Sequence, residues 1–183
     1  MVEDKNFSIF KNLLTKNDQQ IIKDTLLGLD FPWTFISDIT NKKPGLESRP
    51  GFSHIFYEPT STLKSNFQNI VNKITEEGLK KIEKDKGQIV QARGFLQLPL
   101  NKSFETFDDP HIDLNYDHIV FLYYVCDSDG DTILFSKDKN FSKIEKQVTP
   151  EQGKLLIFNG KIWHTAQQPK KNIRCVINID LLI

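Results

Sequence analysis

The sequence predicts an α+β protein that is mainly β, in which N-terminal helices pack on one face of an antiparallel double sheet. Apolar residues recur at helical spacing up to about residue 87, and short strand-like runs separated by turn signals follow. The 183 residues, 38% of them hydrophobic, are enough for one sizeable core. We therefore expect one domain over 1–183, with a helical part over 1–87 and a β core over 88–183.

The helical part is expected in two pieces on either side of an irregular segment. Helical spacing runs from Phe7 to Leu29, and residues 15–18 are predicted to form a break and a cap between two short helices. Prolines and glycines punctuate residues 31–59, so only a short strand over 52–57 is expected there. Residues 60–62 are predicted to cap a helix that runs to about Lys84.

The β core is expected to contain seven short strands. The turn signals Asp129-Gly130, Gln152-Gly153 and Asn159-Gly160 suit antiparallel connections, because Asn-Gly and Asp-Gly tolerate the positive φ of tight hairpins. The strand-like runs cover 89–100, 118–126, 132–135, 144–148, 154–158, 162–167 and 173–182.

Charge and hydropathy exclude several classes of protein. Basic and acidic residues both number 24, so nucleic-acid binding is not expected. The apolar runs are far shorter than the roughly 20 residues of a membrane helix. No apolar signal core follows the N-terminus, which favours an intracellular, cytoplasmic location. In such a reducing compartment, Cys126 and Cys175 are expected to be buried thiols rather than a disulfide.

Two of the four histidines are placed for metal binding. His111 and Asp113 are separated by one residue, so in extended chain both side chains project from the same face. His164 lies in a separate strand-like segment, which a sheet folded back on itself can bring to the same point. Two histidines and one carboxylate with open positions are the ligand set of mononuclear non-haem Fe(II) oxygenases. His-x-Asp also arises by chance, so a polar strand residue without a metal stays open as the alternative.

An arginine follows His164 inside an apolar strand. Arg174 is the only charged residue of the run from Ile173 to Ile179. A buried guanidinium needs an anion, and its planar fork matches a carboxylate bidentately. The anion is either a ligand or an acidic side chain of the protein itself.

In order and spacing, these residues resemble the 2-oxoglutarate and Fe(II)-dependent dioxygenases, in particular the prolyl 4-hydroxylase-like branch. The resemblance covers about 89–183. The matching segments are 110–113 (Pro-His-Ile-Asp), 121–125 (Phe-Leu-Tyr-Tyr-Val), 129–132 (Asp-Gly-Asp-Thr), 153–158 (Gly-Lys-Leu-Leu-Ile-Phe), His164 and Arg174.

The resemblance implies a double-stranded β-helix, the cupin-like jelly roll, that holds iron and its co-substrate. His111, Asp113 and His164 would bind Fe(II), and no further catalytic side chain is expected. Arg174 would pair with the distal carboxylate of 2-oxoglutarate, and the same pocket would include Tyr124, Thr132 and Val176. The expected reaction hydroxylates a C–H bond with dioxygen and releases succinate and CO2, with ascorbate as reductant.

Three features of the sequence narrow this expectation. Asp180 stands where nucleic-acid demethylases of the superfamily usually carry a second arginine, and Asp113 is not the Ala or Gly of the halogenases. Asp129-Gly130 replaces the two glycines of many prolyl hydroxylases. A prolyl residue of a peptide or protein is the favoured substrate. A free amino acid or small metabolite is the alternative, and a non-catalytic β-helix binding module that retains the metal is the second.

The remaining candidates have simpler explanations. Residues 127–131 look like a calcium loop but lack its glycine and glutamate, which favours an acidic turn. His54 and His118 have no partner at ligand spacing and are expected as surface or capping residues. Arg93 either contacts substrate or lies on the surface. Residues 31–59 and 101–109 are expected to shape the entrance, because loops on a rigid scaffold carry specificity.

Overall fold

A computed structural model describes residues 6–39, 49–61, 65–100, 107–136 and 143–183. Within these ranges it contains two helices, α1 (Lys16–Leu26) and α2 (Gln68–Lys81). The strands are β1 (Phe7–Phe10), β2 (Thr34–Ile36), β3 (Gly51–Tyr57), β4 (Gln88–Gln97), β5 (Ile119–Tyr124), β6 (Thr132–Phe135), β7 (Ile144–Val148), β8 (Leu155–Asn159), β9 (His164–Ala166) and β10 (Arg174–Leu182).

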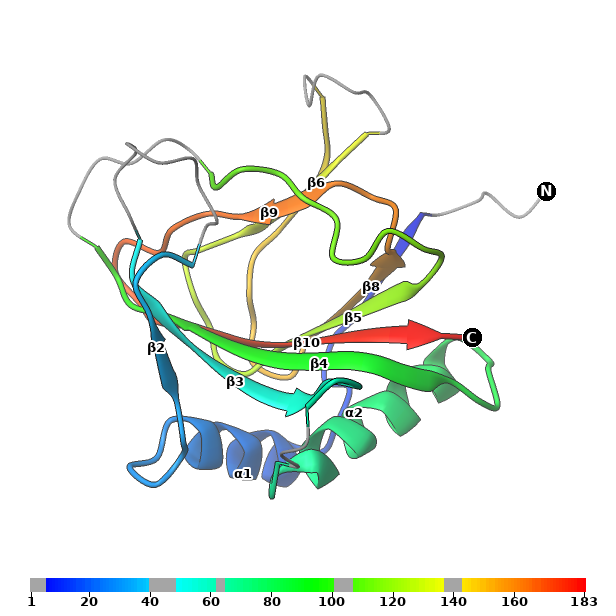
Figure 1. Cartoon of the computed structure of the whole chain (residues 1–183), viewed down its shortest axis with the longest axis horizontal. Coiled ribbons are helices and arrows are strands. Elements are labelled where there is room, and N and C mark those ends of the chain that lie inside the picture. Colours follow the sequence, from blue (N-terminus) through cyan, green and yellow to red (C-terminus); the bar gives the residue numbers. More distant parts are fainter. Residues whose placement is uncertain (1–5, 40–48, 62–64, 101–106, 137–142) are drawn as a thin grey trace.

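The strands form two antiparallel sheets that face each other. The larger sheet has the order β1-β8-β5-β10-β4-β3-β2, and the smaller has the order β7-β6-β9. In Figure 1 the helices lie below the larger sheet, while β6 and β9 lie above it. This arrangement confirms the predicted jelly-roll double-stranded β-helix with helices packed on one sheet.

Alternation along β10 separates two cores. Cys175, Ile177 and Ile179 belong to the core between the larger sheet and the helices, which also contains Ile22 and Ile74. The intervening residues of β10 point to the other side, because successive strand residues face opposite ways. There Val176 packs in a second core between the two sheets, together with Leu122, Leu134 and Phe158. The central strand β10 therefore presents its polar residues to the space between the sheets.

The first helix begins where the sequence predicts. Thr15 caps α1, and its hydroxyl accepts a hydrogen bond from the backbone N–H of Asp18 at 3.2 Å. The helix expected to begin at Phe7 is wrong, since Phe7–Phe10 forms β1 and pairs with β8. A four-residue apolar run does not distinguish helix from strand, and Asn12 then turns the chain with a φ of 52°.

The helical part over 1–87 also supplies strands. The expected strand over 52–57 is present as β3, and β2 and β3 extend the larger sheet beyond β4. Helix α2 begins at Gln68 rather than after residues 60–62, so that predicted cap is wrong, and Thr62 lies outside the described residues. The position before α2, Phe67, makes no side-chain cap, and the Ser65 hydroxyl instead accepts the Phe67 N–H at 3.1 Å.

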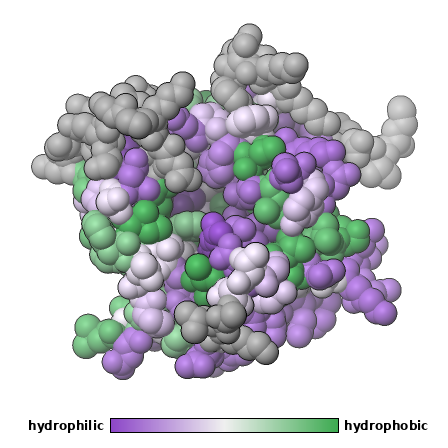
Figure 2. All heavy atoms as spheres, viewed as in Figure 1, coloured by the Kyte–Doolittle hydropathy of each residue, from purple (hydrophilic) through white to green (hydrophobic). Residues whose placement is uncertain are grey.

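The seven strands expected after residue 88 are all present, and β6 and β7 have the predicted bounds. Cys126 and Cys175 are buried free thiols, as expected. Among the described helices, none is long and apolar enough to cross a membrane. On the face shown in Figure 2, hydrophilic and hydrophobic side chains are interspersed.

Candidate active site

A pocket of about 510 Å³ lies between the two sheets. Its walls come from strands far apart in the sequence, because β4 and β10 line one side and β9 with the segment before β5 lines the other. All but one of the predicted site residues line it: His111, Asp113, His164, Arg174, Thr132 and Val176. The exception is Tyr124, which lies just behind the lining residues.

A short β-bridge brings the two predicted metal-binding segments together. His111 and His164 exchange two backbone hydrogen bonds of 3.0 Å each. The Thr165 hydroxyl also donates to the Asp108 carbonyl at 2.7 Å, which fastens the segment before His111 to β9. Local sequence does not dictate this bridge. The bridge places His164 beside the His-x-Asp motif.

The side chains of this triad converge. His111 Nε2 lies 3.6 Å from Asp113 Oδ1, and His164 Nε2 lies 3.5 Å from Asp113 Oδ2. The imidazole centroids are 4.6 Å apart. His111 is the most open of the three, with 57% of its side chain exposed, against 11% for Asp113 and 9% for His164. The triad therefore lies between the buried pocket and solvent.

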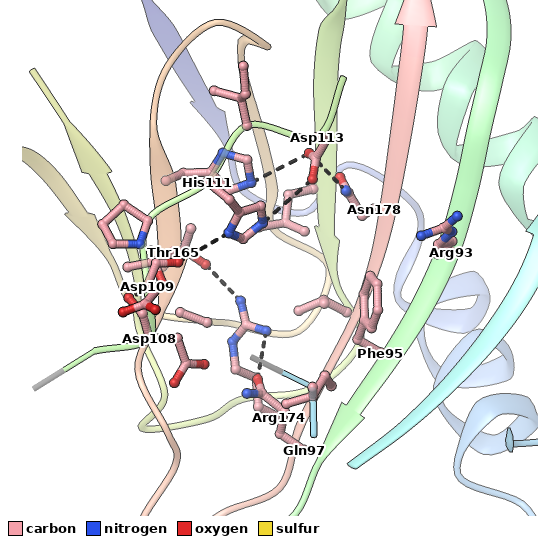
Figure 3. A pocket seen from close by; sticks show the side chains of 18 of the residues that line it. Arg93, Phe95, Gln97, Asp108, Asp109, His111, Asp113, Thr165, Arg174 and Asn178 are labelled. Carbon is pink, nitrogen blue, oxygen red and sulfur yellow. Dashed lines mark hydrogen bonds and ion pairs between the residues drawn. The ribbon is translucent and has the colours of Figure 1, made fainter. Parts of the chain in front are cut away.

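Hydrogen bonds orient these ligand atoms. His164 Nδ1 lies 3.1 Å from the Ile162 carbonyl, which can only accept, so Nδ1 carries the proton and Nε2 keeps its lone pair. Burial lowers the pKa of His164 to about 4, against the opposing effect of Asp113, so the imidazole is neutral at pH 7. Asn178 Nδ2 donates to Asp113 Oδ2 at 3.1 Å and holds the carboxylate (Figure 3).

Arg174 lies deeper in the pocket and is 5% exposed. Its Nε donates to the Gly130 carbonyl at 2.9 Å, Nη1 to Gln97 Oε1 at 3.0 Å, and Nη2 to Thr132 Oγ1 at 2.9 Å. Within the described ranges, no carboxylate forms an ion pair with it. Of the two anions considered from the sequence, an acidic side chain paired with Arg174 is therefore not observed there.

The other predicted pocket residues surround this guanidinium. Tyr124 donates a hydrogen bond from its hydroxyl to Thr132 Oγ1 at 2.9 Å. Burial raises the pKa of Tyr124 to about 12, so the hydroxyl stays protonated and remains a donor. Tyr124 is fully buried and contacts the site through Thr132. Val176 supplies apolar wall between Arg174 and Asn178 on the same face of β10.

The acidic turn after β5 also positions Arg174. The Asp129 carboxylate accepts backbone hydrogen bonds from residues 170–172, at 3.0 Å from Asn172 N. Asp127 accepts one from Gln152 N at 2.6 Å. These carboxylates serve chain connections, in agreement with an acidic turn rather than a calcium loop. The turn fixes the loop before β10 and leaves the Gly130 carbonyl facing Arg174.

Several contributors were not identified from the sequence. Asn178 and Gln97 hold Asp113 and Arg174, and both could have been found by alternation along their strands.

Arg93 lines the pocket and pairs with Glu58 at 2.9 Å, so it is not simply a surface residue. The two expected entrance segments contribute Ile36, Asp38, Ile39, Asp108 and Asp109 to the pocket lining. Arg49 forms a buried ion pair with Asp108.

The expectation for the other two histidines is wrong. His54 is 9% exposed and packs among the rings of Phe31, Phe56 and Phe67, with its nitrogens near the Pro32 carbonyl and the Ser65 hydroxyl. The side chain of His118 is fully buried, 3.7 Å from Asp180. Both positions depend on segments distant in sequence, so neither burial was visible from local spacing.

Comparison with solved structures supports the fold. No protein-family model and no curated protein sequence matches the chain. Among solved structures, a 2-oxoglutarate–Fe(II) oxygenase family protein from Burkholderia pseudomallei superimposes with a TM-score of 0.73 at 10% identity, covering 97% of this chain and 85% of the other.

Two prolyl hydroxylases have similar structures. That of Trichoplax adhaerens, in complex with a hypoxia-inducible factor peptide fragment, gives a TM-score of 0.68 at 14% identity over 98% of this chain and 84% of its own. A prolyl-4-hydroxylase from Pseudomonas putida gives 0.63 at 12% identity over 96% and 91%. The chain therefore has the fold of the 2-oxoglutarate–Fe(II) oxygenases, including those that hydroxylate prolyl residues.

Proposed function

We propose that this chain is an Fe(II)- and 2-oxoglutarate-dependent dioxygenase that hydroxylates a C–H bond. One observation carries the proposal. His111, Asp113 and His164 converge at one end of a pocket whose deeper end holds Arg174, buried and without an acidic partner among the described residues. A fold can host many activities, so the proposal depends on these side chains and not on the similarity alone.

The donor set fits iron. Two imidazole nitrogens and one carboxylate suit a divalent transition metal and leave positions open for other ligands. His164 Nε2 carries a free lone pair. Both His111 Nε2 and His164 Nε2 lie within 3.6 Å of an Asp113 oxygen. Ligands about 2.1 Å from a common ion are separated by distances of this order. We therefore assign His111, Asp113 and His164 as the metal ligands.

The deeper part of the pocket fits 2-oxoglutarate. A guanidinium carries five N–H groups, and three from Arg174 go to Gly130, Gln97 and Thr132, which leaves two for a ligand carboxylate. A bidentate pair with the distal carboxylate would neutralise the buried charge. Thr132 and Val176 would line the co-substrate, and Tyr124 would hold the Thr132 hydroxyl in place.

The residues of the chain bind the metal and the co-substrate, orient them, and exclude water from the site. With iron and 2-oxoglutarate bound, dioxygen hydroxylates a C–H bond while 2-oxoglutarate yields succinate and CO2, and ascorbate keeps the iron reduced. Asn178 holds the carboxylate of Asp113, and the Ile162 carbonyl fixes the proton of His164 on Nδ1, so that Nε2 would be available to hold the metal. Apolar side chains of the inter-sheet core, Leu122, Phe158 and Val176, limit water around the reacting groups.

We further propose a prolyl residue of a peptide or protein as the substrate. The prolyl hydroxylases above share the fold, one of them with a peptide bound. His111 lies open at the pocket mouth, where an extended chain can reach the metal. The equal numbers of basic and acidic residues do not favour nucleic acid. Strands from both parts of the chain share one sheet, which supports a single oxygenase domain over 1–183.

Mass spectrometry tests the substrate class. Proline-containing peptides incubated with the protein, Fe(II), 2-oxoglutarate and ascorbate are expected to gain one oxygen on proline. If the peptides stay unmodified and a free amino acid or metabolite stimulates succinate release, the substrate is a small molecule and not a peptide. A protein that binds metal but releases no succinate under any of these conditions would be a binding module.

A further inference from the structure

A second group of potential metal ligands lies behind the carboxylate of Asp113. His118, Asp180 and Asp113 each offer one ligand atom, and these atoms lie within 4.8 Å of one another. Asp180 is on β10, two residues beyond Asn178, and is paired in register with Val120 of β5. The side chains of His118 and Asp180 are 0% and 1% exposed, so neither is solvated.

Three polar atoms of this group have no hydrogen-bond partner among the described residues. Within the described part of the chain, both carboxylate oxygens of Asp180 and Nε2 of His118 are buried without one. A buried carboxylate is strongly disfavoured unless a cation or hydrogen-bond donors compensate it. The large majority of buried side-chain polar atoms in proteins have a partner, so three atoms without one in the same place require an explanation.

The tautomer of His118 directs a lone pair into the group. Its Nδ1 lies 2.8 Å from the Tyr116 carbonyl, which only accepts, so Nδ1 carries the proton of the neutral imidazole. Nε2 is then a lone pair that faces Asp180 Oδ1 at 3.7 Å. When Asp180 is ionised, two acceptors face each other at a distance too long for a hydrogen bond. An electropositive species between them would satisfy both.

The spacing matches that of the first triad. The 3.7 Å between His118 Nε2 and Asp180 Oδ1 is close to the 3.6 Å and 3.5 Å that separate the histidine nitrogens from the Asp113 oxygens. Gly160 packs closely against the imidazole of His118, because a Cβ at that position would lie 2.1 Å from His118 Nε2. The atoms of this group therefore have the spacing of metal ligands.

From this geometry we propose that His118, Asp180 and Asp113 form a second site for a divalent transition-metal ion. One imidazole and two carboxylates suit borderline ions such as Zn²⁺, Co²⁺, Mn²⁺ or Fe²⁺ better than Mg²⁺ or Ca²⁺, which prefer oxygen ligands throughout. Asp113 has two oxygens and is shared with the first triad, so the two sites are linked through one carboxylate. The second ion compensates the buried charge of Asp180.

Metal stoichiometry tests the second site without relying on turnover. The metal-free full chain is dialysed to saturation against Co²⁺, and the bound cobalt per chain is measured by elemental mass spectrometry. The parent is expected to bind two equivalents. Asp180→Asn and His118→Gln are each expected to bind one, because each removes a ligand of the second site alone. His164→Ala is also expected to bind one, held by the second site.

A matched control is the exposed neighbour Asp117, whose side chain is 84% exposed and pairs with Lys161. Asp117→Asn is expected to keep both equivalents. A parent that saturates at one equivalent overturns the second site even if a variant fails to fold. Two equivalents in both Asp180→Asn and His118→Gln overturn it as well. Neither result affects the proposed oxygenase function, which is tested separately by succinate release.

Discussion

Replacing Arg174 by alanine removes the group that is proposed to hold 2-oxoglutarate. The guanidinium is buried, and three of its donors are used by Gly130, Gln97 and Thr132. The remaining two N–H groups face the pocket in the proposed complex. Arg174→Ala removes these donors and their charge, and leaves the metal-binding side chains of the first triad in place.

The size of the effect follows from the burial of the pair. Removing one partner of a buried, hydrogen-bonded charge pair costs about 3–5 kcal/mol. At about 1.4 kcal/mol per tenfold change, even 3 kcal/mol weakens binding by more than about 100-fold. The metal affinity of the first triad is expected to change by less than about threefold, since Arg174 contacts none of its ligands.

Calorimetric titration of 2-oxoglutarate into the Mn²⁺-loaded protein measures the affinity of the protein for the co-substrate. Arg93→Ala is the matched control, because Arg93 lines the same pocket but is paired with Glu58 at 2.9 Å. That variant is expected to keep its affinity for 2-oxoglutarate. Equal affinities in Arg174→Ala and the parent would show that Arg174 has a structural role only, and the assignment of the co-substrate pocket would be refuted.

Three further predictions concern other parts of the molecule. His164→Ala is expected to remove one equivalent of bound metal and to abolish succinate release, as measured by metal analysis and turnover; unchanged values would contradict the ligand assignment. Gly78→Ala is expected to lower stability by about 1–3 kcal/mol in thermal unfolding, because the added Cβ would lie 2.4 Å from the Phe121 ring. This loss is expected despite the better helix propensity of alanine. An unchanged melting temperature would argue against this packing. Burial lowers the pKa of His54 in the folded chain, so as the pH falls below about 6.5 the unfolded chain takes up a proton more readily than the folded chain, and stability falls with pH. His54→Gln is expected to lose less stability than the parent between pH 7.5 and 5.5, and equal losses would refute this explanation.

The sequence predicted the β core well because alternation and turn chemistry act locally. The bounds of β6 and β7 match the prediction, since both strands are short and flanked by polar or turn residues. The N-terminal strand β1 was mistaken for helix, because its hydrogen bonds go to β8, almost 150 residues further on. Pairing partners of this kind are not encoded in the period of a short segment.

The site shows the same division between local and distant information. His111 and Asp113 could be predicted to share a face from their spacing, and Arg174 from the cost of burying a charge. Asn178 lies four residues after Arg174 on the same face of β10, so alternation alone would have indicated it. His118 could not be placed, because its burial depends on distant residues, namely Gly160 directly after β8 and Asp180 of β10.

Succinate release from 2-oxoglutarate tests the central claim most directly. The purified chain is supplied with Fe(II), 2-oxoglutarate, ascorbate and dioxygen, and succinate is quantified with and without each component. The account predicts succinate that requires both Fe(II) and 2-oxoglutarate, and none from Asp113→Ala. Absence of succinate from the parent, together with no measurable binding of 2-oxoglutarate to the metal-loaded protein, would contradict it.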